Sequence, residues 1–249
     1  MTAGTARPEA LVRVRENGPV AELTVGDGTK RNALTSRAWD NLAQQVRVCG
    51  EDGNAGVIVI RGRGDTFCAG SDIGEWLDAE PEFVEESFAR METAFQAIEQ
   101  CPVPVVAAIH GVAAGAGCQL ALACDLRFMA SSARIGMPIA RLGILASPAF
   151  AARMTRSAGP VVAGELLYTG RLLDAADAVR TGLANRCFPD SELDAEVAKT
   201  IAAIRALPAP AIRAAKRSIR TAVRDGSVQN GQPAVSWPEF SRAVHAFVR

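Results

Sequence analysis

Two short, unbroken apolar runs constrain the fold of this chain more than any other feature of its sequence. They are Gly56-Val-Ile-Val-Ile60 and Val105-Val-Ala-Ala-Ile109. A short continuous apolar run is typical of a strand buried on both faces, because an exposed face would require alternating polar residues. The chain has 249 residues, enough to bury such strands in a large core. The sequence therefore predicts an α/β fold.

The remaining elements divide the chain into a strand-rich first half and a helical second half. Residues 11–15 and 20–25 alternate around Asn17-Gly18-Pro19 and predict a β-hairpin. A further strand is expected at 125–129, and helices at 35–48, 82–99, 116–124, 160–168, 174–181, 190–206 (capped by Asp190 or Ser191) and 210–224. Residues 1–8 are expected to be a loose tail and 226–236 a flexible loop. We expect a core domain over 1–190 and a C-terminal helical region over 191–249.

The charge balance and the rare metal ligands exclude several classes of function. Basic and acidic residues number 27 each, which favours neither nucleic acid nor an anionic membrane as a partner. Six cysteines and two histidines lack zinc-site spacing, so buried reduced thiols are expected and no metal site. No apolar stretch is long enough to span a membrane, and residues 1–10 lack the apolar core of a signal peptide. A soluble, cytoplasmic protein is expected.

Two segments rich in small residues follow the apolar runs and are candidates for a ligand site. They are Asp65-Thr-Phe-Cys-Ala-Gly-Ser-Asp-Ile73 and His110-Gly-Val-Ala-Ala-Gly-Ala-Gly-Cys-Gln-Leu120. Gly115 stands where a helix would start, so the N–H groups of the first turn lie free at the positive end of the helix dipole, which suits an oxyanion or a carbonyl oxygen. The alternative is that the glycines only permit close packing of helix and strand.

Two nucleotide-binding interpretations do not agree with the spacing. Gly111, Gly115 and Gly117 do not have the G-x-G-x-x-G spacing of a dinucleotide site, and Asp125 begins the next strand instead of ending it. The sequence has no G-K-[ST] motif, which excludes a P-loop.

Several blocks taken together resemble the enoyl-CoA hydratase/isomerase, or crotonase, family over nearly the whole chain. The blocks are Lys30-Arg-Asn-Ala-Leu34, Phe67-Cys-Ala-Gly-Ser-Asp-Ile73, Pro102-Val-Pro-Val-Val-Ala-Ala-Ile-His-Gly111, Gly115-Ala-Gly-Cys-Gln-Leu120 with Ala123-Cys-Asp-Leu126, and Tyr168-Thr-Gly-Arg-Leu-Leu-Asp-Ala175 with Gly182-Leu-Ala-Asn-Arg186. Their order and spacing are specific, although each block alone is a weak signal.

The resemblance implies a crotonase-like spiral of ββα units with C-terminal helices that form a homotrimer or a dimer of trimers. It implies an acyl-CoA ligand whose thioester carbonyl binds in an oxyanion hole made by the N–H groups of Ser71 and Ala116. Contacts to coenzyme A, here part of the thioester and not a separate cofactor, would lie near four residues: Arg31, Ala33, Ala69 and Ile73. The Arg31 side chain could also bind a CoA phosphate.

Two departures from the family pattern bear on catalysis. Hydratases of the family have two glutamates, and the matching positions here are Gln119 and Ile139. Hydration of a 2-enoyl thioester needs one group to take a proton from water and one to deliver a proton to carbon, and neither an amide nor an alkyl group does either. The segment 145–150 (Leu-Ala-Ser-Pro-Ala-Phe) also replaces a glycine-rich turn, so a more apolar pocket and little hydratase activity are expected.

Three hypotheses about function follow. The protein is an enzyme that stabilises an acyl-CoA enolate with a base not yet identified, a non-catalytic acyl-CoA binder or carrier, or a hydratase or isomerase with a relocated acid/base. Replacement carboxylates could come from Glu75, Asp78 or Glu80, although a solvated helix face is the better explanation of these residues. Asp72 is expected to brace its own loop, and His110 to have a packing role.

Overall fold

The chain forms a crotonase fold built around a six-stranded sheet. The computed structural model describes residues 12–51 and 55–225. The strands lie in the order β1 (Arg13–Asn17), β2 (Val20–Val25), β3 (Val57–Gly62), β4 (Val105–Ile109), β6 (Leu126–Ala130) and β9 (Arg186–Phe188). The hairpin partners β1 and β2 are antiparallel, and every other pair is parallel. The α/β prediction and the positions of both buried strands are confirmed.

A second, smaller sheet has three strands. It consists of β5 (Val112–Ala114), β7 (Arg134–Gly136) and β8 (Leu172–Asp174). From β4 the chain passes through β5, the short helix α3 (Ala116–Ala123) and β6 before it reaches β7. From β4 to β7 successive strands therefore alternate between the two sheets, with α3 between β5 and β6.

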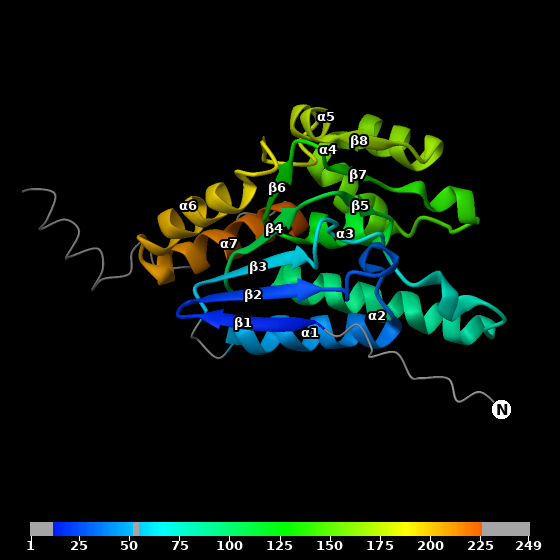
Figure 1. Cartoon of the computed structure of the whole chain (residues 1–249), viewed down its shortest axis with the longest axis horizontal. Helices are drawn as coiled ribbons and strands as arrows, with labels where there is room; N and C mark the ends of the chain where they lie inside the picture. Colours follow the sequence, from blue (N-terminus) through cyan, green and yellow to red (C-terminus); the bar gives the residue numbers. More distant parts are fainter. Residues whose placement is uncertain (1–11, 52–54, 226–249) are drawn as a thin grey trace, which may run out of the picture.

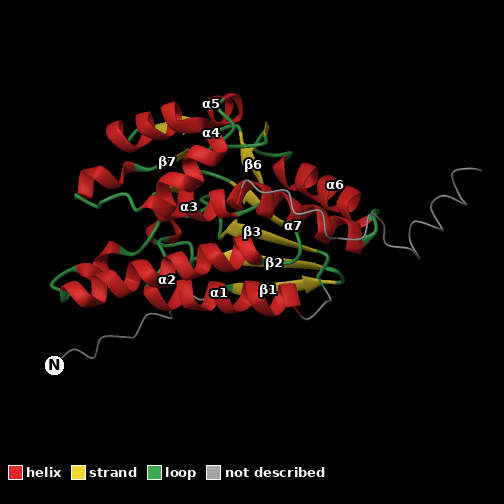
Figure 2. Cartoon of the chain, turned by 180° about the vertical axis from the view of Figure 1, so that it is seen from behind, coloured by secondary structure: helices red, strands yellow, loops and turns green. Residues whose placement is uncertain are grey.

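Helices cover both sides of the large sheet, as strands buried on both faces require. On one side α1 (Ser36–Glu51) packs on β2 and β3 and also against α2 (Pro81–Gln100), while α6 (Leu193–Arg205) packs on β3, β4, β6 and β9 (Figures 1 and 2). Helix α7 (Ala209–Asp225) is attached through the buried Lys216, whose ammonium donates to the Val103 carbonyl and to Asp125. The short helix α5 (Ala175–Arg180) follows β8.

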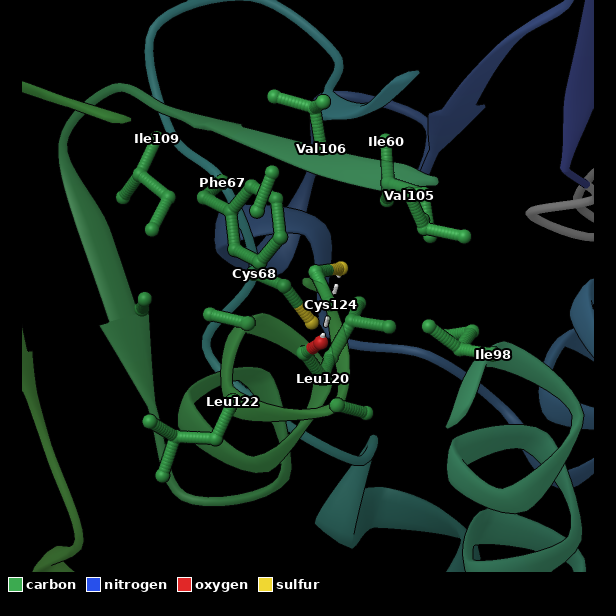
Figure 3. Packing of buried hydrophobic residues seen from close by; sticks show 14 of the residues in the cluster. Ile60, Phe67, Cys68, Ile98, Val105, Val106, Ile109, Leu120, Leu122 and Cys124 are labelled. Carbon is green, nitrogen blue, oxygen red and sulfur yellow. Dashed lines mark hydrogen bonds between the residues drawn. The ribbon is translucent and has the colours of Figure 1, made fainter. Parts of the chain in front are cut away.

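The core between β3, β4 and α3 explains two of the glycines (Figure 3). Phe67 and Cys68, in the segment that follows β3, are fully buried and pack against α3. A Cβ on Gly117 would lie 1.9 Å from the Cys68 carbonyl oxygen, and one on Gly111 would lie 2.3 Å from the Asp65 carbonyl oxygen. The packing interpretation is therefore correct for these two. Gly115 differs, since it has a φ of +57° and a Cβ there would make only ordinary contacts, the nearest with the Ile139 side chain at 3.9 Å.

The structure corrects two predictions in the helical half. Residues 160–168 are only the second part of α4 (Pro148–Thr169), whose first part was missed because Gly159, with non-helical angles, and Pro160 interrupt the pattern. Helix α6 is preceded by Glu192, which makes no side-chain cap, while the Asp190 carboxylate accepts hydrogen bonds from Ser131 and Ser132. The predicted tail at 1–8 and loop at 226–236 lie outside the described residues, and the division at residue 190 stays a prediction.

Candidate functional site

The two small-residue segments meet at one edge of the large sheet, because β3 and β4 are parallel and both end there. The Cys68 N–H donates to the Val112 carbonyl, and the Ala114 N–H donates to the Cys68 carbonyl. Two residues further along each segment, Gly70 and Ala116 are also close, since a Cβ on Gly70 would lie 3.2 Å from the Ala116 nitrogen. Gly70 has a φ of +111°, which a side chain would disfavour. Ser71 and Ala116 are thereby brought together.

A cavity of about 90 Å³ opens at this junction. Its lining comes from four parts of the chain: the segment after β3, helix α2, the start of α3, and residues 138–150, which include the 3-10 helix η3 (Pro138–Leu142). The lining residues are Ala69, Gly70, Ser71, Ile73, Trp76, Phe88, Met91, Gly115, Ala116, Pro138, Ile139, Leu142, Ile144 and Phe150. Five of the eight site residues chosen from the sequence lie among them: Ala69, Ser71, Ile73, Ala116 and Ile139.

Two backbone N–H groups at the cavity have no acceptor within the part of the chain that the structure describes. Leu34 forms an isolated bridge with Ser71, in which the Asp72 N–H donates to the Leu34 carbonyl and the Leu34 N–H donates to the Gly70 carbonyl. The Ser71 N–H takes no part in that bridge, and it donates to no other described residue. Ala116 is the first residue of α3, where an N–H has no partner within the helix, and it too has none among the described residues.

The polar side chains of the lining make their hydrogen bonds elsewhere. The Ser71 hydroxyl donates to the Met91 sulfur at 2.8 Å and accepts from the Trp39 indole at 3.0 Å. The Trp76 indole donates to the Ser87 hydroxyl, and its ring stacks on Phe88. Apart from its backbone, the cavity therefore presents an apolar surface.

Gln119 lies behind the cavity wall and is not among its lining residues. Its side chain is fully buried, and its Nε2 donates to the Phe150 carbonyl at 3.3 Å and lies 3.7 Å from the Met137 sulfur. Its Oε1 has no hydrogen-bond partner among the described residues. The second glutamate position, Ile139, does line the cavity.

None of the lining residues is ionisable. The Glu75 carboxylate accepts from the N–H and the hydroxyl of Ser36 at the start of α1, so it is not a replacement base in this conformation. Asp72 accepts from the Gly74 N–H and pairs with Lys30 at 2.5 Å, which confirms its bracing role. Asp78, Glu80 and His110 also lie outside the lining.

The five cysteines other than Cys187 are buried. Cys68, which adjoins the cavity segment, cannot supply a thiolate, because burial raises the pKa of its thiol to about 12.

The four residues expected near coenzyme A are partly drawn together by a left-handed turn. Lys30, Arg31 and Asn32 have φ values of 44°, 54° and 56°. The buried Asn32 amide holds the turn by accepting from the Gly28 N–H and donating to the Thr66 carbonyl. The Arg31 carbonyl in turn accepts from the Ala69 N–H at 3.0 Å.

At this turn the Arg31 side chain is exposed and Ala33 is half-buried. Ile73 is 54% exposed at the cavity mouth and begins the 3-10 helix η2 (Ile73–Trp76).

The sequence did not single out the aromatic and thioether side chains that line the cavity from α2 and α4. Phe88 and Met91 stand three residues apart on α2, a spacing that indicates a shared buried face but not what that face surrounds. Within residues 12–51 and 55–225 no three metal-ligating side chains gather. None of the described helices has the length and apolar character of a membrane span.

The alternating strands of two sheets, with a small-residue junction that exposes two N–H groups, define a protein of the crotonase fold. The chain belongs to the enoyl-CoA hydratase/isomerase family, whose model matches residues 15–234. It is 36% identical over 224 residues to Mycobacterium bovis "Probable enoyl-CoA hydratase echA6", covering 90% of this chain and 87% of that protein. It is 34% identical over 198 residues to the crotonyl-CoA hydratase of Syntrophomonas wolfei, covering 79% and 76%.

Solved structures agree with this assignment. An enoyl-CoA hydratase/carnitine racemase from Magnetospirillum magneticum superposes with a TM-score of 0.83 at 32% identity and covers 96% of this chain and 88% of its own. An enoyl-CoA hydratase-type protein from Thermobifida fusca YX, solved in complex with CoA, has a TM-score of 0.79 at 30% identity and covers 96% and 93%.

Proposed function

We propose that this protein binds an acyl-CoA thioester, with the thioester carbonyl oxygen between the N–H groups of Ser71 and Ala116. The observation that carries the proposal is that both residues line an apolar cavity and that neither N–H has an acceptor among the described residues. A donor that loses water without gaining a partner is costly, and a carbonyl oxygen would satisfy both at once. Two N–H groups that converge on one oxygen would also polarise the thioester.

Coenzyme A itself would bind along the turn at Arg31. The backbone groups of Ala33 and Ala69 would contact the adenine and pantetheine, Ile73 would flank the cavity mouth, and the Arg31 guanidinium would meet a phosphate. The similarity to a relative solved with CoA supports this part of the proposal.

Ordinary hydratase activity is not part of the proposal. The lining offers no carboxylate, imidazole, amine or phenol that could move a proton, since Ile139 is an alkyl group and Gln119 lies behind the wall. A role as a binder or carrier of acyl-CoA therefore agrees best with the site. The alternative, an enzyme that stabilises an enolate, is favoured only by the two free N–H groups and would need a base from outside the lining.

Calorimetry with butyryl-CoA and with free CoA tests the proposal. We expect butyryl-CoA to bind more tightly, because only the thioester fills the cavity and meets both donors. The absence of any butyryl-CoA binding would overturn the proposal. Incubating the complex in heavy water separates the two roles: a binder leaves the α-hydrogens of butyryl-CoA unexchanged, whereas rapid deuterium uptake, seen by mass spectrometry, would reveal a base.

A further inference from the structure

Exposure along the cavity wall defines a mouth and a floor. At the mouth, Ile73 is 54% and Leu142 59% exposed. At the floor, Met91 is 1% and Phe150 5% exposed. Behind the floor the Phe150 ring meets the buried ring of Phe95, with their centroids 6.2 Å apart. An acyl chain that enters past Ile73 would therefore end against Phe150.

The Phe150 backbone is fixed at both of its polar groups. Its N–H donates to the hydroxyl of Ser147, the residue that caps α4, at 3.2 Å. Its carbonyl accepts from the Gln119 amide of α3 at 3.3 Å. The start of α4 is thus attached to the helix that carries Ala116, and the inner wall and the donor N–H groups form one unit.

A charged cluster around Arg153, about one turn after Phe150 on α4, fixes α4 to α2. The Arg153 side chain, 3% exposed, donates to Glu92 at 2.6 and 2.9 Å and to Glu99 at 2.8 Å. Glu92 follows Met91, the other floor residue. Because bidentate contacts of this kind have a defined geometry, they leave Phe150 little freedom to move away from Met91.

We propose that Phe150 sets the maximum acyl length and that Gln119 is the positioning residue that holds it there. The proposal rests on the acyl-CoA function proposed above. A water-sized group needs roughly 10–15 Å³ of such a cavity, so about 90 Å³ holds roughly six to nine such groups. With the thioester oxygen and sulfur among them, the cavity suits an apolar acyl group of roughly four to seven carbons. Gln119 stands at a position where hydratases of the family have a glutamate. Its role here is to hold the cavity wall in place and not to transfer a proton.

Calorimetry with acetyl-, butyryl-, hexanoyl-, octanoyl- and decanoyl-CoA tests the length limit. Each methylene that enters the cavity should tighten binding roughly fourfold, so affinity should rise from acetyl to about hexanoyl and then fall. Phe150→Ala should move the optimum to octanoyl-CoA or longer, and Phe150→Leu, the milder change, should move it in the same direction. The control is Leu145→Ala, which alters a residue just before α4 that is 89% exposed and outside the lining. It should leave the dependence of affinity on acyl length unchanged.

The role of Gln119 is tested by Gln119→Met, which keeps the length of the side chain and removes its donor. A positioning role predicts that the optimum moves toward longer chains while the protein stays folded by circular dichroism. A general structural role would weaken all five ligands by the same factor, and that result would overturn the assignment of Gln119.

A wild-type protein that binds decanoyl-CoA at least as tightly as hexanoyl-CoA would overturn the length limit and leave the proposed function standing. The failure of all five ligands to bind would instead remove the proposed function.

Discussion

Replacing Ala116 with proline would remove one hydrogen-bond donor from the cavity and leave the helix intact. Ala116 is the first residue of α3 and follows Gly115, its N-cap. Proline is well tolerated at this position, because the first N–H has no partner inside the helix and the ring fixes φ near the helical value. The substitution therefore separates the proposed ligand contact from the stability of the fold.

The loss can be estimated from the surroundings of the Ala116 nitrogen. With proline, the thioester oxygen would keep only the Ser71 N–H in an apolar cavity. An unpaired buried polar group costs about 1–3 kcal/mol, which corresponds to roughly 5- to 150-fold weaker binding.

The assay compares butyryl-CoA with S-butyl-CoA, a thioether that lacks the carbonyl oxygen. Calorimetry should show the full loss for the thioester and little loss for the thioether. Ala116→Gly, which keeps the N–H, should bind both ligands as the wild type does. If Ala116→Pro weakens thioester and thioether equally, the effect is steric and the reasoning about the carbonyl oxygen is refuted; if it weakens neither, the carbonyl binds elsewhere.

Three further predictions follow from the site and the core. Wild-type protein should hydrate crotonyl-CoA far below ~1 s⁻¹, the lower end of usual enzymatic rates, and an absorbance assay that finds several turnovers per second would mean that another residue moves the proton. The family resemblance predicts a trimer or a dimer of trimers, and light scattering that shows a stable monomer at micromolar concentration would contradict it. Burial raises the pKa of the Cys68, Cys118 and Cys124 thiols to about 12. Between roughly pH 9 and 12 only the unfolded chain therefore releases these protons, which favours unfolding as the pH rises. Urea unfolding should show the free energy of unfolding falling by about 1.4 kcal/mol per pH unit for each thiol. Cys118→Ala should reduce that slope by the contribution of one thiol, about 1.4 kcal/mol per pH unit, and an unchanged slope would contradict the assignment to these thiols.

The parts of the fold that were predicted correctly are those encoded by local pattern. The strand at 105–109 has the bounds of β4, because five consecutive buried apolar residues leave no other interpretation. The two small-residue segments were singled out for a related reason, since residues after two parallel strands meet at one edge of the sheet, whereas the choice of Ser71 and Ala116 within them came from the family resemblance. The predicted helix at 160–168 is shorter than α4, because Gly159 and Pro160 indicate a helix end in the local sequence although the helix continues on both sides of them.

The cavity wall could not be read from the sequence, because it depends on contacts between distant elements. Met91 and Phe150 are 59 positions apart in the printed sequence, and only the packing of α4 on α2 through Arg153 brings them to one surface. The orientation of Gln119 depends on the same packing, because its hydrogen-bond partner is the Phe150 carbonyl. Sequence position identified Gln119 as the place of a missing glutamate but could not show that its amide binds the Phe150 carbonyl instead of lining the cavity.

That orientation leads to unequal expectations for restoring the two glutamates. A carboxyl at position 119 would be fully buried beside the Phe150 carbonyl, where only its protonated form can donate a hydrogen bond, so burial and the carbonyl would both raise its pKa. Gln119→Glu alone should therefore leave crotonyl-CoA hydration at the wild-type level. A carboxyl at position 139 would line the cavity near Gly115 and Ala116. Ile139→Glu should therefore raise hydration by up to about 10²-fold, the smaller end of what one acid/base group contributes. An absorbance assay on both single variants decides the matter, and a gain from Gln119→Glu without one from Ile139→Glu would show that position 119 faces the ligand after all.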